Sequence, residues 1–439
     1  MIKKLLIANR GEIAVRIIRT CKEMNIETVA VYSTADKDNL HVRMADKAVC
    51  IGPAPSAKSY LNAQAIITAA LLTGAEAIHP GVGFLSENAD FARDVEKAGL
   101  IWIGPEPDTI QMLGDKVQAR MTAEKYKLNP TPGSQGAVTN ENEAKKIAEV
   151  CGFPVIIKAA SGGGGKGMRI VHNAEALASN LQIASTEAQA NFADSTVYIE
   201  KYIENPRHVE LQVVGDGKGG VAILGERDCS VQKNHQKLIE ESPSPAVTNE
   251  MRKKMYEGAY NLFSALKYRG AGTIEFLVSG KNFYFMEVNA RVQVEHPVSE
   301  FVSGVDIIRE QILSCTQNIM TCKDGENKIS GWSIEARINA KAPGTVTRLE
   351  VPGGMGVRFD SFLYNGYKVL PHYDSMVAKV IVYDDTRDKA IKKMLRSLDE
   401  LVIEGVPTNL EQQKEILQNK KFVSGNFGTS FYVEVYGDK

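Results

Sequence analysis

The sequence predicts a mixed α/β and α+β protein with an open parallel domain first, a small insert next and a large antiparallel domain last. Three observations support this prediction. Strand-like apolar runs alternate with helical periods at the start of the chain, a glycine run interrupts its middle, and hairpin patterns fill its second half. At 439 residues the chain is too long for one core, so we expect about two to four domains.

The first domain, expected over residues 1–113, alternates strands and helices. Strands are predicted over residues 4–8, 28–32, 77–78 and 100–103, and helices over residues 12–24 and 62–72. This order is typical of an open parallel sheet, which binds its ligands at the carboxyl ends of the strands. Segments 9–11 and 79–88 fall at those ends, so we expect them to lie beside a ligand.

A glycine-rich segment, KAASGGGGKGMR over residues 158–169, lies inside the small insert expected over residues 130–203. A P-loop is excluded because Gly167, and not Ser or Thr, follows Lys166. The dinucleotide-binding glycine pattern is matched by chance, since that pattern opens a helix and a strand-like MRIV run follows here. The segment is therefore predicted to be a β-hairpin whose soft tip closes over polyphosphate, with a plain surface loop as the alternative.

The third domain, expected over residues 204–439, has the pattern of an antiparallel sheet. Strand, turn and strand follow one another over residues 207–225 and again over residues 271–289. Further strands are predicted over residues 333–338 and 379–383, followed by one helix and a tail. A large antiparallel sheet is expected.

Two glutamates are predicted to face each other across the second of these hairpins. With a three-residue turn at residues 280–282, the cross-strand pairs are Ser279 with Phe283, Leu277 with Phe285, and Glu275 with Glu287. Opposed carboxylates repel each other unless a cation lies between them. Because carboxylate and amide oxygens suit magnesium or manganese, Glu275, Glu287 and Asn289 are the predicted metal ligands.

The run from residue 285 to residue 296 continues this pattern of charged and apolar residues. In an extended chain, one face would carry Glu287, Asn289, Arg291, Gln293 and Glu295. An exposed sheet face is the alternative explanation of such a stripe. Together with the glycine hairpin, the metal ligands indicate a nucleoside triphosphate, whose phosphates Lys116 and Lys158 would contact as point charges.

Composition narrows the classes of function. A net charge of -1 provides no field for nucleic acid or anionic lipid, so neither nucleic acid nor membrane is an expected partner. The six cysteines form no CxxC pair, which favours reduced thiols and a cytoplasmic protein. No signal peptide or apolar membrane-spanning segment is present in the sequence.

Several long motifs resemble the biotin carboxylases of the ATP-grasp superfamily. They are the glycine hairpin, IANRGEIA at residues 7–14, RDCSVQKNHQK at 227–237 and MEVNARVQVEH at 286–296. The resemblance extends from residue 1 nearly to the end of the chain. It implies a Rossmann-like N-terminal domain, a small ATP-grasp lid and a C-terminal ATP-grasp domain.

The resemblance also implies a reaction and a set of residue roles. ATP would phosphorylate bicarbonate to carboxyphosphate, and the carboxyl group would pass to biotin on a carrier protein. The catalytic residues would be Glu295 as base, Arg337 beside the biotin enolate, Lys237 beside carboxyphosphate, and Arg291. Bicarbonate would be bound by Arg291, Gln293, Val294 and Glu295, and biotin by Arg337, Val82 and Gly83. ATP would be bound by Lys116, Lys158, Gly163, Gly164, Gly165, Lys166, Glu200, Lys201, Ile203, His208, Gln232, His235, Glu275, Leu277 and Glu287.

The chain departs from the family pattern near biotin. Val82 replaces a usual tyrosine, Trp332 stands near a usual histidine, and residues 339–347 form a shortened loop. These changes affect the surroundings of Arg337 and leave the nucleotide residues intact.

The chain also carries no biotinylation motif, so the carrier and the carboxyltransferase are expected on separate chains. A homodimer is expected, with Arg16, Arg19 and Asp374 as possible contacts. The acetyl-CoA system is the default acceptor, and pyruvate, another acyl-CoA or urea are alternatives. Two further alternatives are an ATP-grasp ligase that delivers its acyl phosphate to an amine, and a catalytically weak nucleotide-binding assembly subunit.

Overall fold

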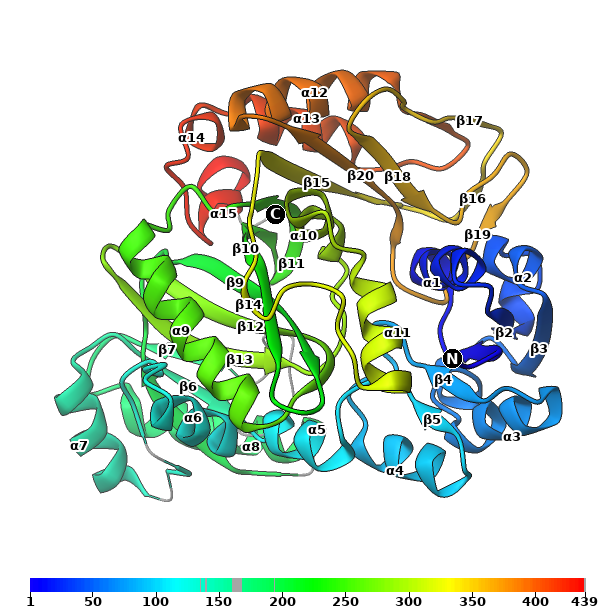
Figure 1. The fold of residues 1–439 in the computed structure, drawn as a ribbon. Helices are drawn as coiled ribbons and strands as arrows, with labels where there is room; N and C mark the ends of the chain where they lie inside the picture. The colour runs from blue at the N-terminus through cyan, green and yellow to red at the C-terminus, as the bar shows by residue number, and fades with distance from the viewer. Residues whose placement is uncertain (135, 139, 160–167, 193, 438–439) are drawn as a thin grey trace.

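A computed structural model of the chain describes residues 1–134, 136–138, 140–159, 168–192 and 194–437. Its strands form a five-stranded sheet near the N-terminus, a three-stranded sheet in the middle and a nine-stranded sheet in the second half, with two two-stranded ribbons. Figure 1 shows the N-terminal sheet at the right, the middle segment at the lower left and the C-terminal helices at the top. The predicted combination of α/β and α+β architecture is confirmed.

The N-terminal sheet is parallel throughout and has the strand order β3-β2-β1-β4-β5. Its elements are β1 (Lys4–Ile7), α1 (Gly11–Glu23), β2 (Glu27–Ser33), α2 (Leu40–Met44), β3 (Lys47–Gly52), α3 (Ala63–Thr73), β4 (Ala77–His79), α4 (Ala89–Lys97) and β5 (Ile101–Trp102). The strands and helices predicted here are confirmed. The sequence analysis missed β3, an edge strand whose largely exposed side chains lack the apolar run of a buried strand.

The strand order reverses between β1 and β4, and the two segments expected beside a ligand meet at this point. Asn9 Nδ2 donates to the carbonyl oxygen of Val82 at 2.8 Å. Arg10 Nε donates to Asp36 Oδ2 at 2.6 Å, and its guanidinium carbon lies 4.3 Å from the centroid of the Tyr373 ring. The loop after β4 is therefore fixed against β1, and Tyr373 from the C-terminal region packs against the end of the N-terminal sheet.

The middle segment folds around the antiparallel sheet β7-β6-β8. Its elements, with the two helices before it, are α5 (Pro107–Gly114), α6 (Lys116–Lys125), α7 (Glu141–Cys151), β6 (Val155–Ala159), β7 (Met168–Val171), α8 (Leu177–Phe192) and β8 (Val197–Lys201). The predicted hairpin is confirmed, since β6 and β7 pair up to Lys158 and Met168. Its tip, with Gly163, Gly164, Gly165 and Lys166, lies outside the described residues. Buried residues between 138 and 199 form a cluster separate from the other cores, so this segment has a core of its own.

The large sheet has the order β13-β12-β9-β10-β11-β15-β20-β18, with β14 paired to β10. Its strands, and the strands of the small ribbons, are β9 (Arg207–Asp216), β10 (Val221–Lys233), β11 (Gln236–Ser242), β12 (Arg269–Ser279), β13 (Asn282–Asn289), β14 (Gly325–Glu326), β15 (Trp332–Asn339), β16 (Gly344–Thr345), β17 (Arg348–Glu350), β18 (Val357–Ser361), β19 (Lys368–Val369), β20 (Met376–Asp384) and β21 (Val402–Glu404). Neighbouring strands along the main path are antiparallel, as predicted.

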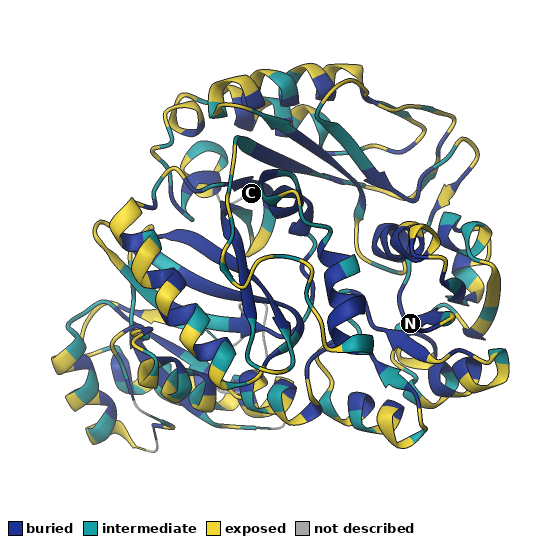
Figure 2. Ribbon diagram, viewed as in Figure 1, coloured by how far each residue is buried: buried dark blue, intermediate teal, exposed yellow. Residues whose placement is uncertain are grey.

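Helices cover this sheet. They are α9 (Asn249–Ala265), α10 (His296–Ser303), α11 (Ile307–Gln317), α12 (Arg387–Glu400), α13 (Leu410–Gln418), α14 (Lys420–Val423) and α15 (Phe431–Tyr436). The prediction of one helix and a tail after β20 is wrong, because α13, α14 and α15 are too short to display a helical period in the sequence. Figure 2 shows the strands buried and the outward faces of α9 and α12 exposed. Within the described residues, no helix combines the length and the apolar character needed to cross a membrane.

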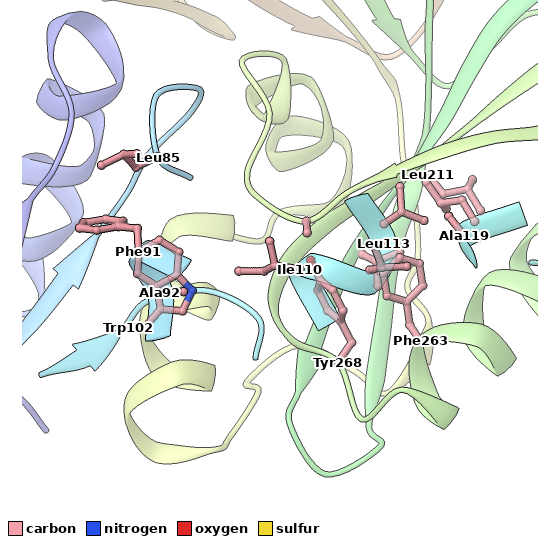
Figure 3. Close-up of a cluster of buried hydrophobic side chains, with 14 of the residues drawn as sticks. Leu85, Phe91, Ala92, Trp102, Ile110, Leu113, Ala119, Leu211, Phe263 and Tyr268 are labelled. Carbon is pink, nitrogen blue, oxygen red and sulfur yellow. The ribbon is translucent and has the colours of Figure 1, made fainter. Parts of the chain in front are cut away.

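The N-terminal sheet and the large sheet share a hydrophobic core (Figure 3). Phe91 and Trp102 meet edge to face with ring centroids 5.6 Å apart, and Phe263 and Tyr268 do the same at 4.8 Å. Ile110 of α5 lies between these two pairs in the same cluster. Because the core is continuous, the two sheets form a common base, whereas the middle segment is packed around separate residues.

Candidate active site

The hairpin of β12 and β13 places Glu275 directly opposite Glu287, as predicted. The register that produces this pair is different. Ser279 pairs with Asn282 across a two-residue turn, and Met286 is an extra, bulged residue in β13. The tighter turn and the bulge each shift the register by one residue, so their effects cancel at the glutamates. The predicted pairs of Ser279 with Phe283 and of Leu277 with Phe285 are wrong, and the observed partners are Asn282 and Tyr284.

Four side-chain partners surround the buried Glu275 carboxylate. Oε1 accepts hydrogen bonds from Asn289 Nδ2 at 2.9 Å, from Gln293 Nε2 at 2.8 Å and from Lys237 Nζ at 3.3 Å, and Oε2 lies 2.8 Å from His208 Nε2. Although burial opposes the charge, Lys237 and His208 hold the pKa of Glu275 well below its usual range. Burial alone would lower the pKa of His208, but Glu275 raises it. Glu275 is therefore a fixed anion at the centre of the site.

Glu287 differs from Glu275 because, among the described residues, no donor forms a hydrogen bond with its carboxylate. It is half-buried, and within the described part of the chain it forms no hydrogen bond or ion pair. Burial and the facing Glu275 raise the pKa of Glu287, while Lys116 opposes this shift. A free carboxylate facing a second carboxylate, with the Asn289 amide beside it, is an oxygen-rich set that fits magnesium or manganese.

Lys237 and Arg337 connect the metal-ligand region to the predicted base. Lys237 Nζ donates to Glu295 Oε1 at 2.6 Å and to Glu210 Oε2 at 2.7 Å, in addition to its contact with Glu275. Arg337 donates to the other oxygen of Glu295 at 3.0 Å. One continuous line of contacts therefore runs from Glu275 through Lys237 and Glu295 to Arg337.

Glu295 is fully buried and ionised in this arrangement. Burial would raise its pKa, but Lys237, Arg337 and Arg227 hold the pKa of Glu295 well below its usual range. A carboxylate shared by two cations is a weak base. The base strength of Glu295 therefore increases when Lys237 or Arg337 turns toward a substrate group.

The extended run predicted over residues 285–296 is wrong beyond Asn289. β13 ends at Asn289 and α10 begins at His296, and the segment between them turns. Because β13 is an edge strand, no second ladder holds the chain extended past that point. Gln293 and Glu295 still reach the site, but they do so from the turn and not by sheet alternation.

Arg291, the predicted bicarbonate guanidinium, is oriented by a loop of the N-terminal sheet. Its Nε donates to Glu87 Oε2 at 2.7 Å, and the backbone N–H of Ala290 donates to Glu87 Oε1 at 3.1 Å. A further contact joins Arg291 to Asn289 Oδ1 at 2.9 Å. The sequence analysis singled out segment 79–88 as ligand-adjacent but did not assign a role to Glu87.

Cations gather where the phosphates are expected. Lys116 begins α6, whose N-terminus is capped by Asp115 through the N–H of Val117 at 2.9 Å. Lys158 Nζ lies 2.5 Å from Glu200 Oε2, and Arg120 contacts the other oxygen of Glu200. Even beside Glu200, burial lowers the pKa of Lys158 to about 8, and the neighbouring Lys116 and Arg120 add to this effect. These cations repel one another, so an anion among them is stabilising.

The other predicted residues lie around this centre. Gln232 Nε2 is 2.6 Å from His208 Nδ1, so the two predicted ribose and phosphate contacts touch each other. Lys201 Nζ donates to the carbonyl oxygens of Gly152 at 3.0 Å and Phe153 at 2.8 Å. The structure leaves Ile203, Leu277 and Val82 half-buried and Gly83 and His235 exposed, with His235 in the turn between β10 and β11.

A buried pair beneath the site was not predicted from the sequence. Arg227 Nε donates to Glu210 Oε1 at 2.5 Å, and both side chains are 0% exposed. Glu210 on β9 pairs with Glu275 on one side and with Arg227 on the other. The alternation of His208, Glu210 and Gln212 along β9 is the signal that could have identified Glu210.

This arrangement of a glycine hairpin, clustered lysines and opposed carboxylates on a large antiparallel sheet defines an ATP-dependent ligase with the ATP-grasp fold. Residues 1–110 match the family described as "Biotin carboxylase, N-terminal domain" and residues 335–434 match "Biotin carboxylase C-terminal domain". Residues 115–318 match "Carbamoyl-phosphate synthase L chain, ATP binding domain". The chain belongs to the biotin carboxylase family.

Relatives and solved structures agree over nearly the whole chain. Biotin carboxylase 1 of Bacillus subtilis is 51% identical, covering 99% of each chain. The crystal structure of a biotin carboxylase complex with β,γ-ATP from Campylobacter jejuni has a TM-score of 0.95 at 45% identity and covers 99% of each chain. The biotin carboxylase domain dimer of 2-oxoglutarate carboxylase from Hydrogenobacter thermophilus, in complex with MgADP, ADP and bicarbonate, has a TM-score of 0.94 at 43% identity and covers 99% of this chain and 98% of that one.

Proposed function

We propose that this chain carries out the first half-reaction of a biotin-dependent carboxylase. It carboxylates biotin with bicarbonate and ATP, through carboxyphosphate. The observation that carries the proposal is the contact of Lys237 with both Glu275 and Glu295, at 3.3 and 2.6 Å. This lysine joins the metal-ligand region to the bicarbonate region. The MgADP and bicarbonate held by the Hydrogenobacter thermophilus relative support the same substrates here.

In the nucleotide half of the site, Glu275, Glu287 and Asn289 would hold magnesium or manganese. When bound, the metal offsets the negative charge that develops on the phosphates during phosphoryl transfer. Lys116 and Lys158 contact the phosphates. The other nucleotide contacts that we assign are Gly163, Gly164, Gly165, Lys166, Glu200, Lys201, Ile203, His208, Gln232, His235 and Leu277.

In the bicarbonate half, Arg291 presents a guanidinium that Glu87 keeps in orientation. Gln293 and the backbone N–H of Val294 add donors, and Glu295 removes the bicarbonate proton. Because Lys237 and Arg337 depress the basicity of Glu295, a turn of Lys237 toward the phosphates of ATP would strengthen the base before carboxyphosphate forms.

In the neighbouring biotin region, Arg337 stabilises the ureido enolate. Carboxyphosphate breaks into CO₂ and phosphate beside Lys237, the phosphate takes the N1′ proton of biotin, and N1′ then attacks CO₂. Val82 and Gly83 lie in the loop after β4 and would border biotin. Trp332, which departs from the family pattern, donates its Nε1–H to Glu241 Oε2 at 2.8 Å.

We also propose a division of the chain into domains over residues 1–113, 130–203 and 204–439. The separate core of the middle segment supports its movement as a lid over the nucleotide. Lid closure would exclude water, which matters because carboxyphosphate hydrolyses easily.

The partners follow from the reaction. We propose a biotin carrier and a carboxyltransferase on separate chains, a cytoplasmic location, and acetyl-CoA as the final acceptor, with pyruvate, another acyl-CoA or urea as alternatives. We also propose a homodimer. Arg19 and Asp374 are exposed and available for a dimer contact, whereas Arg16 is 7% exposed and pairs within the chain with Glu300 and Asp306 at 2.7 and 2.8 Å.

Bicarbonate-dependent ATP cleavage, measured with and without free biotin, tests this proposal. We expect cleavage to require bicarbonate and to be stimulated by biotin, and candidate carriers to accumulate carboxybiotin. Cleavage that requires an amine instead would identify an amine-directed ligase. Nucleotide binding without cleavage would identify an assembly subunit, and either result would overturn the proposal.

A further inference from the structure

On the strands β11 and β15, another pair of glutamates lies directly opposite each other in the large sheet. Glu240 on β11 pairs with Glu335 on β15, and both side chains are 0% exposed. Directly opposite residues of an antiparallel pair have Cβ atoms about 4.5–5.5 Å apart and lie on the same face, so their carboxyl groups can touch. The reaction proposed above gives neither residue a role.

The hydrogen bonds of this pair are incomplete. Glu240 Oε1 accepts from Arg337 Nε at 2.5 Å, but Glu240 Oε2 finds no partner among the described residues. Both oxygens of Glu335 are likewise without one. A buried carboxylate with no donor is very costly, whereas a protonated carboxyl costs less and supplies an O–H donor. The unpaired Glu240 Oε2 is an acceptor for that donor.

Among the described residues, no cation near Glu335 is free to pair with it. The groups on neighbouring strands and in the preceding loop are Glu240, Glu295, Arg337 and Lys379. The elements packed against this face add Glu12 and Arg16 from α1, His296 and Glu300 from α10, and Arg358 and Asp360 from β18.

Each of the nearby cations is already engaged by another group. Lys379 Nζ donates to the Val294 carbonyl oxygen at 2.6 Å and lies 3.3 Å from Glu12 Oε2. Arg337 is shared by Glu240 and Glu295. Arg358 pairs with Asp360 and Glu300.

We propose that Glu335 keeps a proton at neutral pH and donates it as a hydrogen bond to Glu240, so that the carboxyl pair holds Arg337 in position for the biotin step. Burial raises the pKa of Glu335 well above its usual range, with Lys379 opposing the shift and Glu240 adding to it. Burial also raises the pKa of Glu240 to about 7, although Arg337 opposes this shift. Since Arg337 bonds Glu240 and not Glu335, the proton belongs on Glu335 and the charge on Glu240.

The shared proton has a consequence for turnover. If Arg337 turns from Glu240 toward the biotin ureido group, Glu240 loses its cation inside the protein. The hydrogen bond from Glu335 then stabilises the remaining negative charge, and at neutral pH the pair carries only one charge. Glu240 and Glu335 are thus positioning residues that act through Arg337, and this inference rests on the role proposed for Arg337.

Two substitutions at Glu335 separate a proton donor from a charge. Glu335→Gln keeps an N–H donor toward Glu240 and is neutral, so we expect carboxybiotin formation at neutral pH within about threefold of the wild type. Glu335→Leu keeps a similar volume but cannot donate, and we expect about a tenfold loss. Bicarbonate-dependent ATP cleavage without biotin should change by less than about twofold in both variants, because both keep Arg337 beside Glu295 and Arg337 reaches a substrate only in the biotin step.

The pH profile provides a readout that a merely structural role would not change. Wild-type carboxybiotin formation should decline at alkaline pH as Glu335 loses its proton and the pair becomes doubly charged. The Gln variant should lack this decline. Equal losses in Glu335→Gln and Glu335→Leu at neutral pH would show that Glu335 works as an anion, which would overturn the proposal.

Infrared difference spectroscopy tests the proton directly and does not depend on activity. The wild-type protein at neutral pH should show the carbonyl stretching band of a protonated carboxyl group, and Glu335→Gln should lose it. The control is Glu226→Gln, since Glu226 is buried with both oxygens bonded by Arg252, and this variant should keep the band. A spectrum unchanged by Glu335→Gln would overturn the proposal. Failure of bicarbonate-dependent ATP cleavage in the wild type would overturn the proposed function instead.

Discussion

Two pairs of directly opposed glutamates in the large sheet have different surroundings, while a third pair, Glu210 with Glu275, shares the cation of Lys237. Glu275 and Glu287 lie at the edge of the sheet, on β12 and β13, where Glu275 collects four partners and Glu287 keeps a free carboxylate. Glu240 and Glu335 lie inside the sheet, on β11 and β15, beneath α10. Glu287 of the first pair has carboxylate oxygens available for a metal ion. The second pair is fully buried, and Glu240 Oε2 and both Glu335 oxygens lack a hydrogen-bond donor among the described residues.

The comparison shows that opposed carboxylates do not specify an ion by themselves. We expect a cation as the partner where one strand is an edge and the carboxylate is half-buried, because a metal and its phosphate ligands can approach. We expect a proton as the partner where both strands are internal and the nearby cations are already engaged. Burial and neighbouring charges, and not the register alone, decide between the two.

The largest expected effect comes from a substitution in the pair of Glu275 and Glu287, the proposed metal ligands. Glu275→Gln removes the anion that binds His208 and Lys237, so bicarbonate-dependent ATP cleavage should fall on the order of a thousandfold. Steady-state phosphate release measures this change. The matched control is Glu226→Gln. Glu226 is buried in the same sheet, and its carboxylate pairs with Arg252. A Glu275→Gln enzyme within about tenfold of the wild type would contradict a metal role for this pair.

The next effect distinguishes carboxyl transfer to biotin from ATP cleavage. Arg337→Ala should reduce carboxybiotin formation on the order of a hundredfold, because the enolate loses its cation, while biotin-independent ATP cleavage stays within about threefold. The two rates are measured on the same enzyme samples. Arg387→Ala is a control, since Arg387 forms a buried pair with Glu241 at 2.7 Å next to the second pair but outside the site. Equal losses of both activities would contradict the proposal that Arg337 contacts a substrate only in the biotin step.

A smaller effect is expected at the loop that reaches the site from the N-terminal sheet. Glu87→Gln weakens the orientation of Arg291, so the KM for bicarbonate should rise about tenfold with little change in kcat. Initial rates at varied bicarbonate concentration measure this ratio. Glu96→Gln, in a surface pair with Arg269 at 3.4 Å, should leave the KM unchanged. An unchanged KM in Glu87→Gln would show that Arg291 needs no support from Glu87.

The smallest effect is a pH slope of stability. Because the pKa of Glu335 is raised in the folded protein, its contribution to stability is complete below the unfolded pKa of about 4.3 and declines as pH rises toward the folded pKa. The free energy of unfolding of the wild type relative to Glu335→Gln should therefore fall with rising pH, by up to about 1.4 kcal/mol per unit. Urea unfolding at several pH values measures this difference. A difference that rises with pH would mean that Glu335 is ionised in the folded state.

The sequence predicted the layers of the fold and the opposed pair at Glu275 and Glu287, because period-two alternation and glycine-rich turns determine both. The predicted register of this hairpin was wrong. The tighter turn and the bulge shift the register in opposite directions, so the same two glutamates are still opposed. The end of β13 was also not predicted, because a charged and apolar alternation persists into a turn that tertiary contacts form.

The sequence could not identify Glu87 or the pair of Glu240 and Glu335. Glu87 comes from a different sheet, and its contact with Arg291 depends on how the two sheets pack. Glu240 and Glu335 are almost a hundred positions apart, and only the pairing of β11 with β15 makes them neighbours. Contacts between distant strands depend on topology, which local patterns do not determine.

Bicarbonate-dependent ATP cleavage by Glu287→Gln and Glu335→Gln, measured side by side, tests the contrast between the two pairs most directly. We predict almost complete loss in Glu287→Gln, which removes a proposed metal ligand, and nearly wild-type cleavage in Glu335→Gln, which replaces a carboxyl group proposed to be neutral by a neutral amide. Similar rates in the two variants, whether both high or both low, would contradict it.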